Sequence, residues 1–206
     1  LSCPVRMDDP EVKRLVESDI AVVCVDRRME DVRVDTILSD NRAGAHKAVT
    51  HLIACGHERI GFIGGIPRIS TSMDRRKGYE QALAEHDVPV DPALIREGDS
   101  RWERGTDLTN ELLDLPDPPT AIFTGNNLTT LGALEAINVR GLSVPDDVAL
   151  VGYDDIPWAM ALNPPPTVID QPGYEMGRRA ARILLNRLAS PDRSPTTVTL
   201  QPKLIV

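Results

Sequence analysis

Two acidic side chains follow apolar runs of the kind that form buried strands. Asp154 comes shortly after the run at residues 148–151, and Asp26 comes directly after the run at residues 21–25. In an open α/β sheet, ligands bind at the carboxyl ends of the strands. Carboxylates accept hydrogen bonds from hydroxyl groups, so both acids are candidates for binding a small polar ligand. Acids at strand ends also form turns and cap helices, and for both residues that alternative stays open.

Strand-like and helix-like segments alternate along the chain and predict an α/β protein with a mostly parallel sheet. Residues 41–151 give four helix–strand repeats, which are enough for one complete small sheet. Residues 1–38 do not give a complete sheet, because their strands lack neighbours within this sequence. We therefore expect a first subdomain that has lost its N-terminal half.

The composition is ordinary for a globular protein and argues against several partners. The 206 residues are 41% hydrophobic and 26% charged, with a net charge of −8. No apolar run approaches the roughly 18 residues of a membrane span, and no secretory signal is visible, so we expect no membrane partner. The acidic charge argues against this part of the protein binding the phosphate backbone of DNA, which requires clustered Lys and Arg.

Residue types that bind metals or catalyse reactions form no known pattern. Cys3, Cys24 and Cys55 contain no CxxC pair, and the four histidines add no metal-ligand spacing. We interpret the cysteines as small hydrophobic side chains in a reducing compartment, which indicates the cytoplasm. No GxSxG or HExxH occurs, and residues 61–65 do not form GxGxxG. We expect no metal, no cofactor and no enzymatic activity.

Five stretches, in order along the chain, resemble motifs of the LacI-type bacterial transcription regulators. They are HLIACGHERIGFIGG at 51–65, RRKGYEQAL at 75–83, PTAIF with NN and GAL at 119–134, VPDDVALVGYDD at 144–155 and QPGYEMG at 171–177. The resemblance covers the whole chain. It implies a periplasmic-binding-protein-like (type I) fold of two parallel-sheet subdomains joined by three crossovers, with the N-subdomain incomplete.

The resemblance also implies where the subdomains begin and end. We expect the chain to cross near Asp40, near residues 168–171 and near residues 193–196. The N-subdomain would then be residues 1–39 plus 170–193, and the C-subdomain residues 41–168 plus 196–206. The DNA-binding head of the family, a helix-turn-helix with a hinge helix, would lie upstream of this sequence.

The same resemblance implies a set of effector-binding residues. Asp26 and Asp154 match the family's strand-end acids, and Arg75 matches the effector-binding Arg before its GY pair. Arg75 could instead be a solvated charge on the helix surface, like its neighbours. Thr71 matches a position that often contacts the effector, although a Thr in a polar loop can also be simply solvated. The expected set is Asp26, Thr71, Arg75, Ser100, Trp102, Asn126 and Asp154.

The sequence departs from the family pattern at Asn127 and at Ser100. Asn126 could cap a helix as well as bind ligand, and it is followed by Asn127 where the family usually has Asp. Ser100 stands where the family often has an aromatic residue. Trp102, two positions later, could replace that residue by stacking on a sugar or base, or could pack on the surface.

Three functions follow as hypotheses. The first is the ligand-sensing and dimerisation core of a transcriptional regulator, taken here as a repressor, that forms a homodimer. It would bind a sugar- or nucleoside-like effector between two subdomains, and operator DNA through the upstream head. The second is a solute-binding protein of a sugar transport system. The third is a sugar- or nucleotide-processing enzyme, which would require a nucleophile or an acid–base pair that the sequence does not single out.

Overall fold

Two sheets organise the protein, which we describe from a computed structural model of residues 1–4, 6–156, 162 and 164–206. Each sheet belongs to its own compact unit. Unit 1 contains Leu1–Asp40, Arg68–Thr71 and Gln171–Pro202. Unit 2 contains Asn41–Pro67, Ser72–Asp170 and Lys203–Val206.

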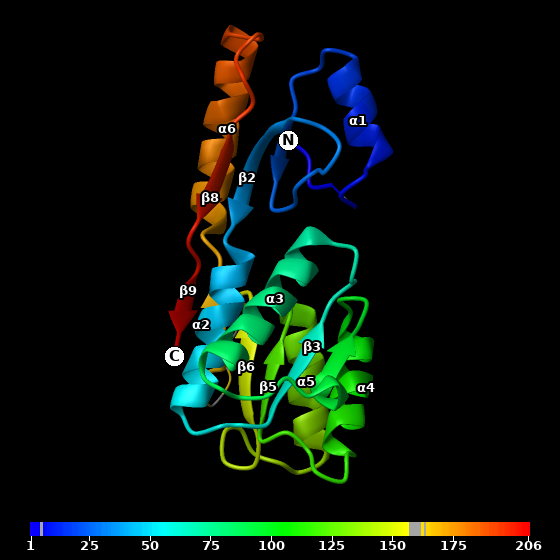
Figure 1. Cartoon of the computed structure of the whole chain (residues 1–206), viewed down its shortest axis with the longest axis vertical. Helices are drawn as coiled ribbons and strands as arrows, with labels where there is room; N and C mark the ends of the chain where they lie inside the picture. The colour runs from blue at the N-terminus through cyan, green and yellow to red at the C-terminus, as the bar shows by residue number, and fades with distance from the viewer. Residues whose placement is uncertain (5, 157–161, 163) are drawn as a thin grey trace. The chain divides into compact units, whose positions relative to one another are not determined.

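Unit 2 is built on a six-stranded sheet with the order β4-β3-β5-β6-β7-β9 (Figure 1). Its strands are β3 (Ile60–Gly64), β4 (Ile95–Glu97), β5 (Ala121–Thr124), β6 (Ala149–Tyr153), β7 (Thr167–Asp170) and β9 (Lys203–Ile205). Neighbouring strands are parallel, except that β9 runs antiparallel to β7. Because β4 and β5 lie on opposite sides of β3, the strand order reverses there, and such a reversal opens a crevice at the carboxyl ends of the strands.

Helices cover both faces of this sheet. Apolar residues of α2 and α3 pack on one face, and those of α4 and α5 pack on the other. On the first face, the ring of Phe62 stacks between Tyr79 and Phe123, at centroid distances of 5.1 and 5.6 Å. The helices are α2 (Asn41–Ala54), α3 (Ser70–Glu85), α4 (Trp102–Leu113) and α5 (Asn127–Val139), with a 3-10 turn, η1 (Pro92–Leu94), before β4.

Unit 1 contains a three-stranded parallel sheet with the order β1-β2-β8. Its strands are β1 (Val23–Val25), β2 (Asp35–Ser39) and β8 (Thr197–Leu200). Residues of α1 (Pro10–Glu17) pack on one face, and those of α6 (Gly173–Ala189) pack on the other. Asp9 caps α1, because its carboxylate accepts a hydrogen bond from the Glu11 N–H.

The third crossing lies later in the chain than the sequence indicated. It was expected at residues 193–196, but the structure keeps residues up to Pro202 in unit 1 and changes unit at Lys203. The reason is that β8 pairs in parallel with β2, from Thr36 opposite Thr197 to Ser39 opposite Leu200. Residues 196–202 therefore complete the sheet of unit 1.

A buried charged cluster holds the ends of β2, α6 and β8 together. The Asp35 carboxylate is fully buried and accepts hydrogen bonds from the Thr196 N–H at 2.8 Å and from Arg187 Nε at 2.9 Å. Burial alone would raise the pKa of Asp35, but the hydrogen bonds from Thr196 and Arg187 hold that pKa below its usual value. Asp35 is therefore charged and paired at neutral pH.

The helices of the described residues were also compared with the length and apolarity of a membrane span. None of them is both long enough and apolar enough to cross a membrane.

Candidate functional site

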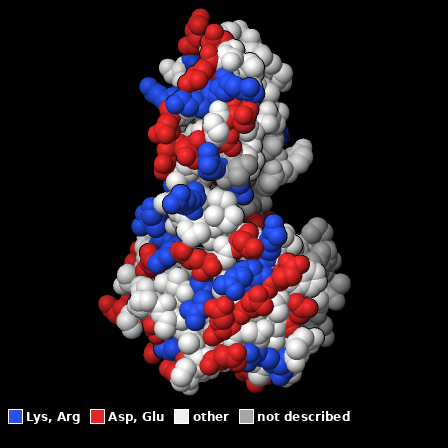
Figure 2. Space-filling view, turned by 90° about the vertical axis from the view of Figure 1, so that its right-hand side faces the viewer, with Lys and Arg blue, Asp and Glu red and all other residues white. Residues whose placement is uncertain are grey.

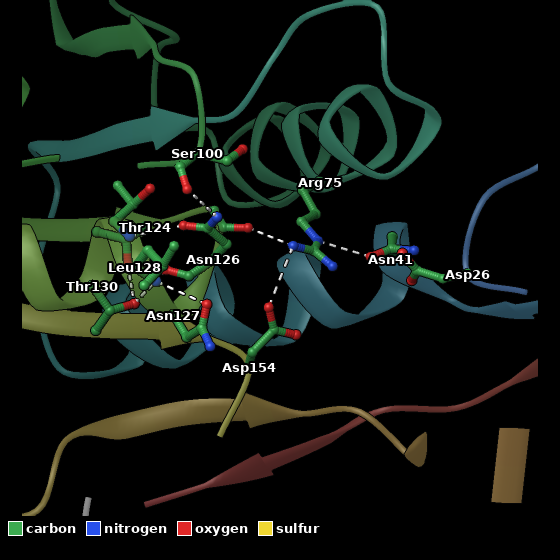
Figure 3. A network of polar contacts seen from close by, with 12 residues as sticks. Asp26, Asn41, Arg75, Ser100, Thr124, Asn126, Asn127, Leu128, Thr130 and Asp154 are labelled. Atoms are coloured by element: carbon green, nitrogen blue, oxygen red, sulfur yellow. Dashed lines mark hydrogen bonds and ion pairs between the residues drawn. The ribbon is translucent and has the colours of Figure 1, made fainter. Parts of the chain in front are cut away.

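Arg75 lies among the carboxyl ends of the strands of unit 2. It belongs to α3, is 6% exposed, and lies near the strand-order reversal at β3. Its Nε donates a hydrogen bond to the Asn41 side-chain oxygen at 2.7 Å, and its Nη1 donates to the Gly125 carbonyl at 2.5 Å (Figure 3). Because a buried charge is costly without partners, these contacts explain how the guanidinium is accommodated.

The end of β6 supplies two more partners of Arg75. The guanidinium carbon lies 3.6 Å from the centre of the Tyr153 ring, a cation–π contact with a fully buried aromatic residue. The next residue, Asp154, places a carboxylate oxygen 4.0 Å from Nη1. Asp154 has a φ of 72°, a left-handed conformation that Asp tolerates better than most residues. The end of β6 thus places the Tyr153 ring against the face of the guanidinium and the Asp154 carboxylate beside it.

This arrangement leaves hydrogen-bonding capacity for a ligand. Among the described residues, none accepts a hydrogen bond from Arg75 Nη2. The Asp154 side chain is 27% exposed, and a carboxylate has room for several hydrogen bonds. A donor and an acceptor side by side can bind neighbouring hydroxyl groups, which both donate and accept.

A further carboxylate lies on the strand next to Asp154. In the parallel pairing of β6 with β7, Tyr153 is opposite Ile169, so the following residues, Asp154 and Asp170, are also neighbours. Burial, and then the negative charge of Asp155, raises the pKa of Asp170, with a smaller contribution from Asp154. The end of this sheet is therefore rich in negative charge.

Asn126 and Ser100 are brought together, and their contacts are with the protein. Asn126 caps α5, because its side-chain oxygen accepts a hydrogen bond from the Thr129 N–H at 2.8 Å. Its amide nitrogen donates to the Ser100 carbonyl at 3.0 Å. The capping role expected from the sequence is therefore present, and it also fixes the loop that contains Ser100 to the start of α5 (Figure 3).

Trp102 takes the second of the two roles that the sequence left open. It is the first residue of α4, is 45% exposed, and donates its indole N–H to Glu135 of α5 at 2.8 Å. It lines a cavity of about 750 Å³ beside α5, together with Leu131 and Leu134. The structure thus does not group Trp102 with Arg75, whose partners are at the ends of β5 and β6.

Asp26 and Thr71 belong to unit 1. Asp26 follows β1 with a φ of 70°, and its N–H donates to the Ile37 carbonyl at 2.8 Å. Thr71 is buried at the start of α3, next to Ser70, whose hydroxyl accepts a hydrogen bond from the Arg28 N–H at 3.4 Å. Effector binding by these two residues stays a prediction.

Two residues of this site, Asn41 and Tyr153, were not predicted. Asn41 had no predicted role in ligand binding, although it follows a strand-like run just as Asp26 and Asp154 do. Tyr153 lies in the family-like stretch at residues 144–155 and was given no role of its own. A polar or aromatic residue at a strand end was the available signal in both cases.

The fold and the site together define a class of protein. A parallel sheet with helices on both faces and polar groups at its strand-order reversal is typical of domains that bind small ligands. Within unit 2, the polar groups that converge there are Asn41, Arg75 and Asp154.

Comparison with known proteins identifies the family. Residues 49–206 match the family described as periplasmic binding protein-like domain. The sequence is 40% identical over 158 residues, 77% of this chain, to the HTH-type transcriptional repressor CytR of Escherichia coli (strain K12). The structure resembles that of the transcriptional regulator CelR in complex with cellobiose, with a TM-score of 0.91, 34% identity, and coverage of 98% of this chain and 62% of that one.

A second solved structure extends this result. A regulatory protein of the LacI family from Chloroflexus aggregans has a TM-score of 0.91 and 32% identity, and the match covers 98% of this chain and 73% of that one. The chain therefore belongs to the family of periplasmic binding protein-like domains and, within it, to the LacI family of regulators. These relatives are named as regulators, which favours a regulator over a transport protein. The chain spans about half the length of the repressors it matches, 46% of CytR.

Proposed function

We propose that this chain is the effector-binding core of a DNA-binding transcriptional repressor, and that Arg75 and Asp154 bind the hydroxyl groups of a sugar or nucleoside. The observation that carries the proposal is the fixed guanidinium of Arg75, whose Nη2 has no acceptor among the described residues, beside the partly exposed carboxylate of Asp154. The complex of CelR with cellobiose supports a sugar as one candidate class.

The proposal includes a mechanism of signalling. Units 1 and 2 would be the two subdomains, and ligand binding would close them upon each other. Closure would alter the geometry of paired DNA-binding heads, which is a coupling between two sites through a hinge. In this proposal the protein acts in the cytoplasm, where the DNA it regulates is found.

Binding without catalysis fits the chemistry of the site. An Arg side chain stays protonated at any physiological pH and therefore cannot act as a general base. The Asp154 carboxylate lies 4.0 Å from Arg75 Nη1, and in this proposal it accepts hydrogen bonds from the hydroxyl groups of the ligand. We therefore propose that the site holds its ligand unchanged.

Operator DNA would be bound by another part of the protein. In the view of Figure 2, basic and acidic side chains alternate over unit 2. Many of these charges are paired: Arg76 contacts Glu80 and Glu97, and Arg96 contacts Glu111. Such a surface lacks the clustered positive charge that binds a phosphate backbone.

We also propose that the protein is a homodimer. Leu128 of α5 is 42% exposed, and the cavity beside this helix is lined by Leu131 and Leu134, so α5 offers an apolar surface to a second copy. Leu131→Asp is expected to give a monomer in sedimentation velocity. An unchanged dimer would place the contact elsewhere.

A thermal-shift screen with four compounds tests the ligand proposal. Ribose, cellobiose, adenosine and cytidine would each be added to the intact protein, and at least one is expected to raise its melting temperature. Arg75→Met, which keeps the length of the side chain without its donors, should abolish that shift. Arg76→Met is the matched control, because Arg76 pairs with Glu80 and Glu97 and has no role in the proposed site. A full shift in Arg75→Met would refute the proposal, as would no shift with any compound in the wild type.

A further inference from the structure

Asn41 occupies an unusual position in the chain. It is the first residue of unit 2 after the first crossing, and it is also the first residue of α2. Its side chain does not point to solvent, since the residue is 4% exposed and accepts the 2.7 Å hydrogen bond from Arg75 Nε. The partner of Arg75 is therefore a residue at a chain crossing.

The contact with Asn41 fixes one direction of the guanidinium plane. A guanidinium is planar and its N–H groups point in fixed directions. The Gly125 carbonyl holds Nη1, and the ring of Tyr153 lies against the face of the group. Without an acceptor at Nε, the guanidinium can turn over the ring and lose its alignment with Asp154. The bond to Asn41 prevents this rotation.

The residue before Asn41 is itself held in place. The Asp40 N–H donates to the Leu200 carbonyl at 2.8 Å, and the Asp40 carboxylate accepts a hydrogen bond from the Gln201 side chain at 2.9 Å. Leu200 and Gln201 directly precede the third crossing at Pro202. Asp40 thus ties the first crossing to the segment of the third, and its covalent neighbour is Asn41.

We propose that Asn41 is a positioning residue that orients Arg75 for the ligand and links that orientation to the first chain crossing. The proposal rests on the function proposed above for Arg75. It adds that a change in backbone geometry at Asp40 and Asn41 alters how Arg75 presents its Nη2 to the ligand. Asn41 acts through Arg75 in this scheme and does not itself contact ligand.

Nuclear magnetic resonance of the arginine Nε–H groups tests the positioning role without any ligand. In the intact protein labelled with ¹⁵N-arginine, Arg75→Met identifies the Arg75 signal. Because this N–H is buried and bonded, its hydrogen exchange with water should be slow. Asn41→Ala and Asn41→Ser should accelerate that exchange at least tenfold. Asn41→Asp, which keeps an acceptor oxygen in place, should keep it slow.

Two features of this design separate positioning from a structural effect. Ser is a good residue at helix starts but is too short to replace the acceptor, so Asn41→Ser protects α2 while removing the contact. Asn110→Ala is the matched control, because Asn110 accepts a hydrogen bond from Arg140 Nε at 2.6 Å in an exposed pair. It should leave the Arg75 signal unchanged. Exchange within twofold of wild type in both Asn41→Ala and Asn41→Ser would overturn the proposal.

Ligand affinity provides the second measurement. For any compound among ribose, cellobiose, adenosine and cytidine that binds the wild type, Asn41→Ser should raise the dissociation constant at least fivefold, and Asn110→Ala should not. An unchanged dissociation constant in Asn41→Ser would overturn the proposal. If none of the four compounds binds the wild type, the proposed ligand class fails, and the exchange measurement still decides the positioning role.

Discussion

The contact between α4 and α5 depends on two glycines, Gly105 of α4 and Gly132 of α5. The backbone of the other helix approaches Gly132 more closely than it approaches Gly105. A Cβ atom added to Gly132 would lie 2.3 Å from the Trp102 carbonyl oxygen and 2.5 Å from the Thr106 nitrogen. Both are backbone atoms of α4, so no change of rotamer can relieve the overlap. Gly132→Ala therefore forces the two helices apart.

The size of the effect follows from two opposing contributions. Ala is the better helix former, and the gain over Gly is about 1 kcal/mol. Overpacking a well-packed core forces side chains off their rotamers and shifts the backbone, at a cost of roughly 1–3 kcal/mol. Because the added Cβ of Gly132→Ala overlaps backbone atoms, the cost should lie near the upper end, at about 3 kcal/mol. The free energy of unfolding should therefore fall by about 2 kcal/mol. Leu108, Leu112 and Ile137, which pack between these helices and the sheet, would lose contacts as well.

Gly177 of α6 provides a matched control, because it is also a helical glycine but has no atom within 4 Å of an added Cβ. Gly177→Ala should raise the free energy of unfolding by up to about 1 kcal/mol through helix propensity alone. Urea unfolding followed by circular dichroism measures both variants. Trp102 fluorescence in a Trp158→Phe background reports on the α4–α5 contact separately. A Gly132→Ala variant as stable as wild type would refute the reasoning.

Three further predictions concern polar groups. Asp35→Asn should lower the free energy of unfolding by about 3 kcal/mol, as measured in urea, because it leaves the largely buried Arg187 without its counter-charge. In the wild type the pKa of Asp35 is lowered, so the stability that this residue contributes should be lost as the pH falls through that pKa. Folding raises the pKa of Asp170, so its charged form destabilises the protein once the pH rises above the folded-state pKa. Asp170→Asn removes that charge and should therefore raise the melting temperature at pH 8 but not at pH 3, where Asp170 is protonated in both states. Asn126→Ala should cost about 1 kcal/mol through loss of the α5 cap, and Asn126→Asp should restore most of it, as measured by thermal unfolding.

The α/β architecture could be predicted because its signals are local. Short apolar runs alternate with segments of helical spacing from residue 41 to residue 151, and the sheet of unit 2 follows that pattern. The partner of β8 could not be predicted in this way. Its sequence, Thr-Val-Thr-Leu, is typical of a strand, but nothing in it selects β2, which lies about 160 residues earlier, over a strand of unit 2.

The candidate site was predicted in part for the same reason. Arg75 and Asp154 stand at recognisable positions, and the structure places them 4.0 Å apart. The contributions of Asn41 and Tyr153 depend on where α2 and β6 lie relative to α3, which only the packed sheet determines. Trp102 was included in the predicted site because its position two residues after Ser100 suggested stacking on a ligand. In the structure it lies at the start of α4, and its indole N–H donates to Glu135.

The pairing of β2 with β8 also has a consequence for synthesis on the ribosome. The five parallel strands of unit 2 are all present once residue 170 has emerged, whereas β2 has only β1 beside it until residue 200 follows. Asp35 also lacks its partners until Arg187 and then Thr196 have emerged, so before that it is an unpaired charge at the start of an open strand. A nascent chain that pauses before residue 197 therefore exposes the backbone of β2 as a template for pairing with another chain, and this edge is where chaperone protection would be needed.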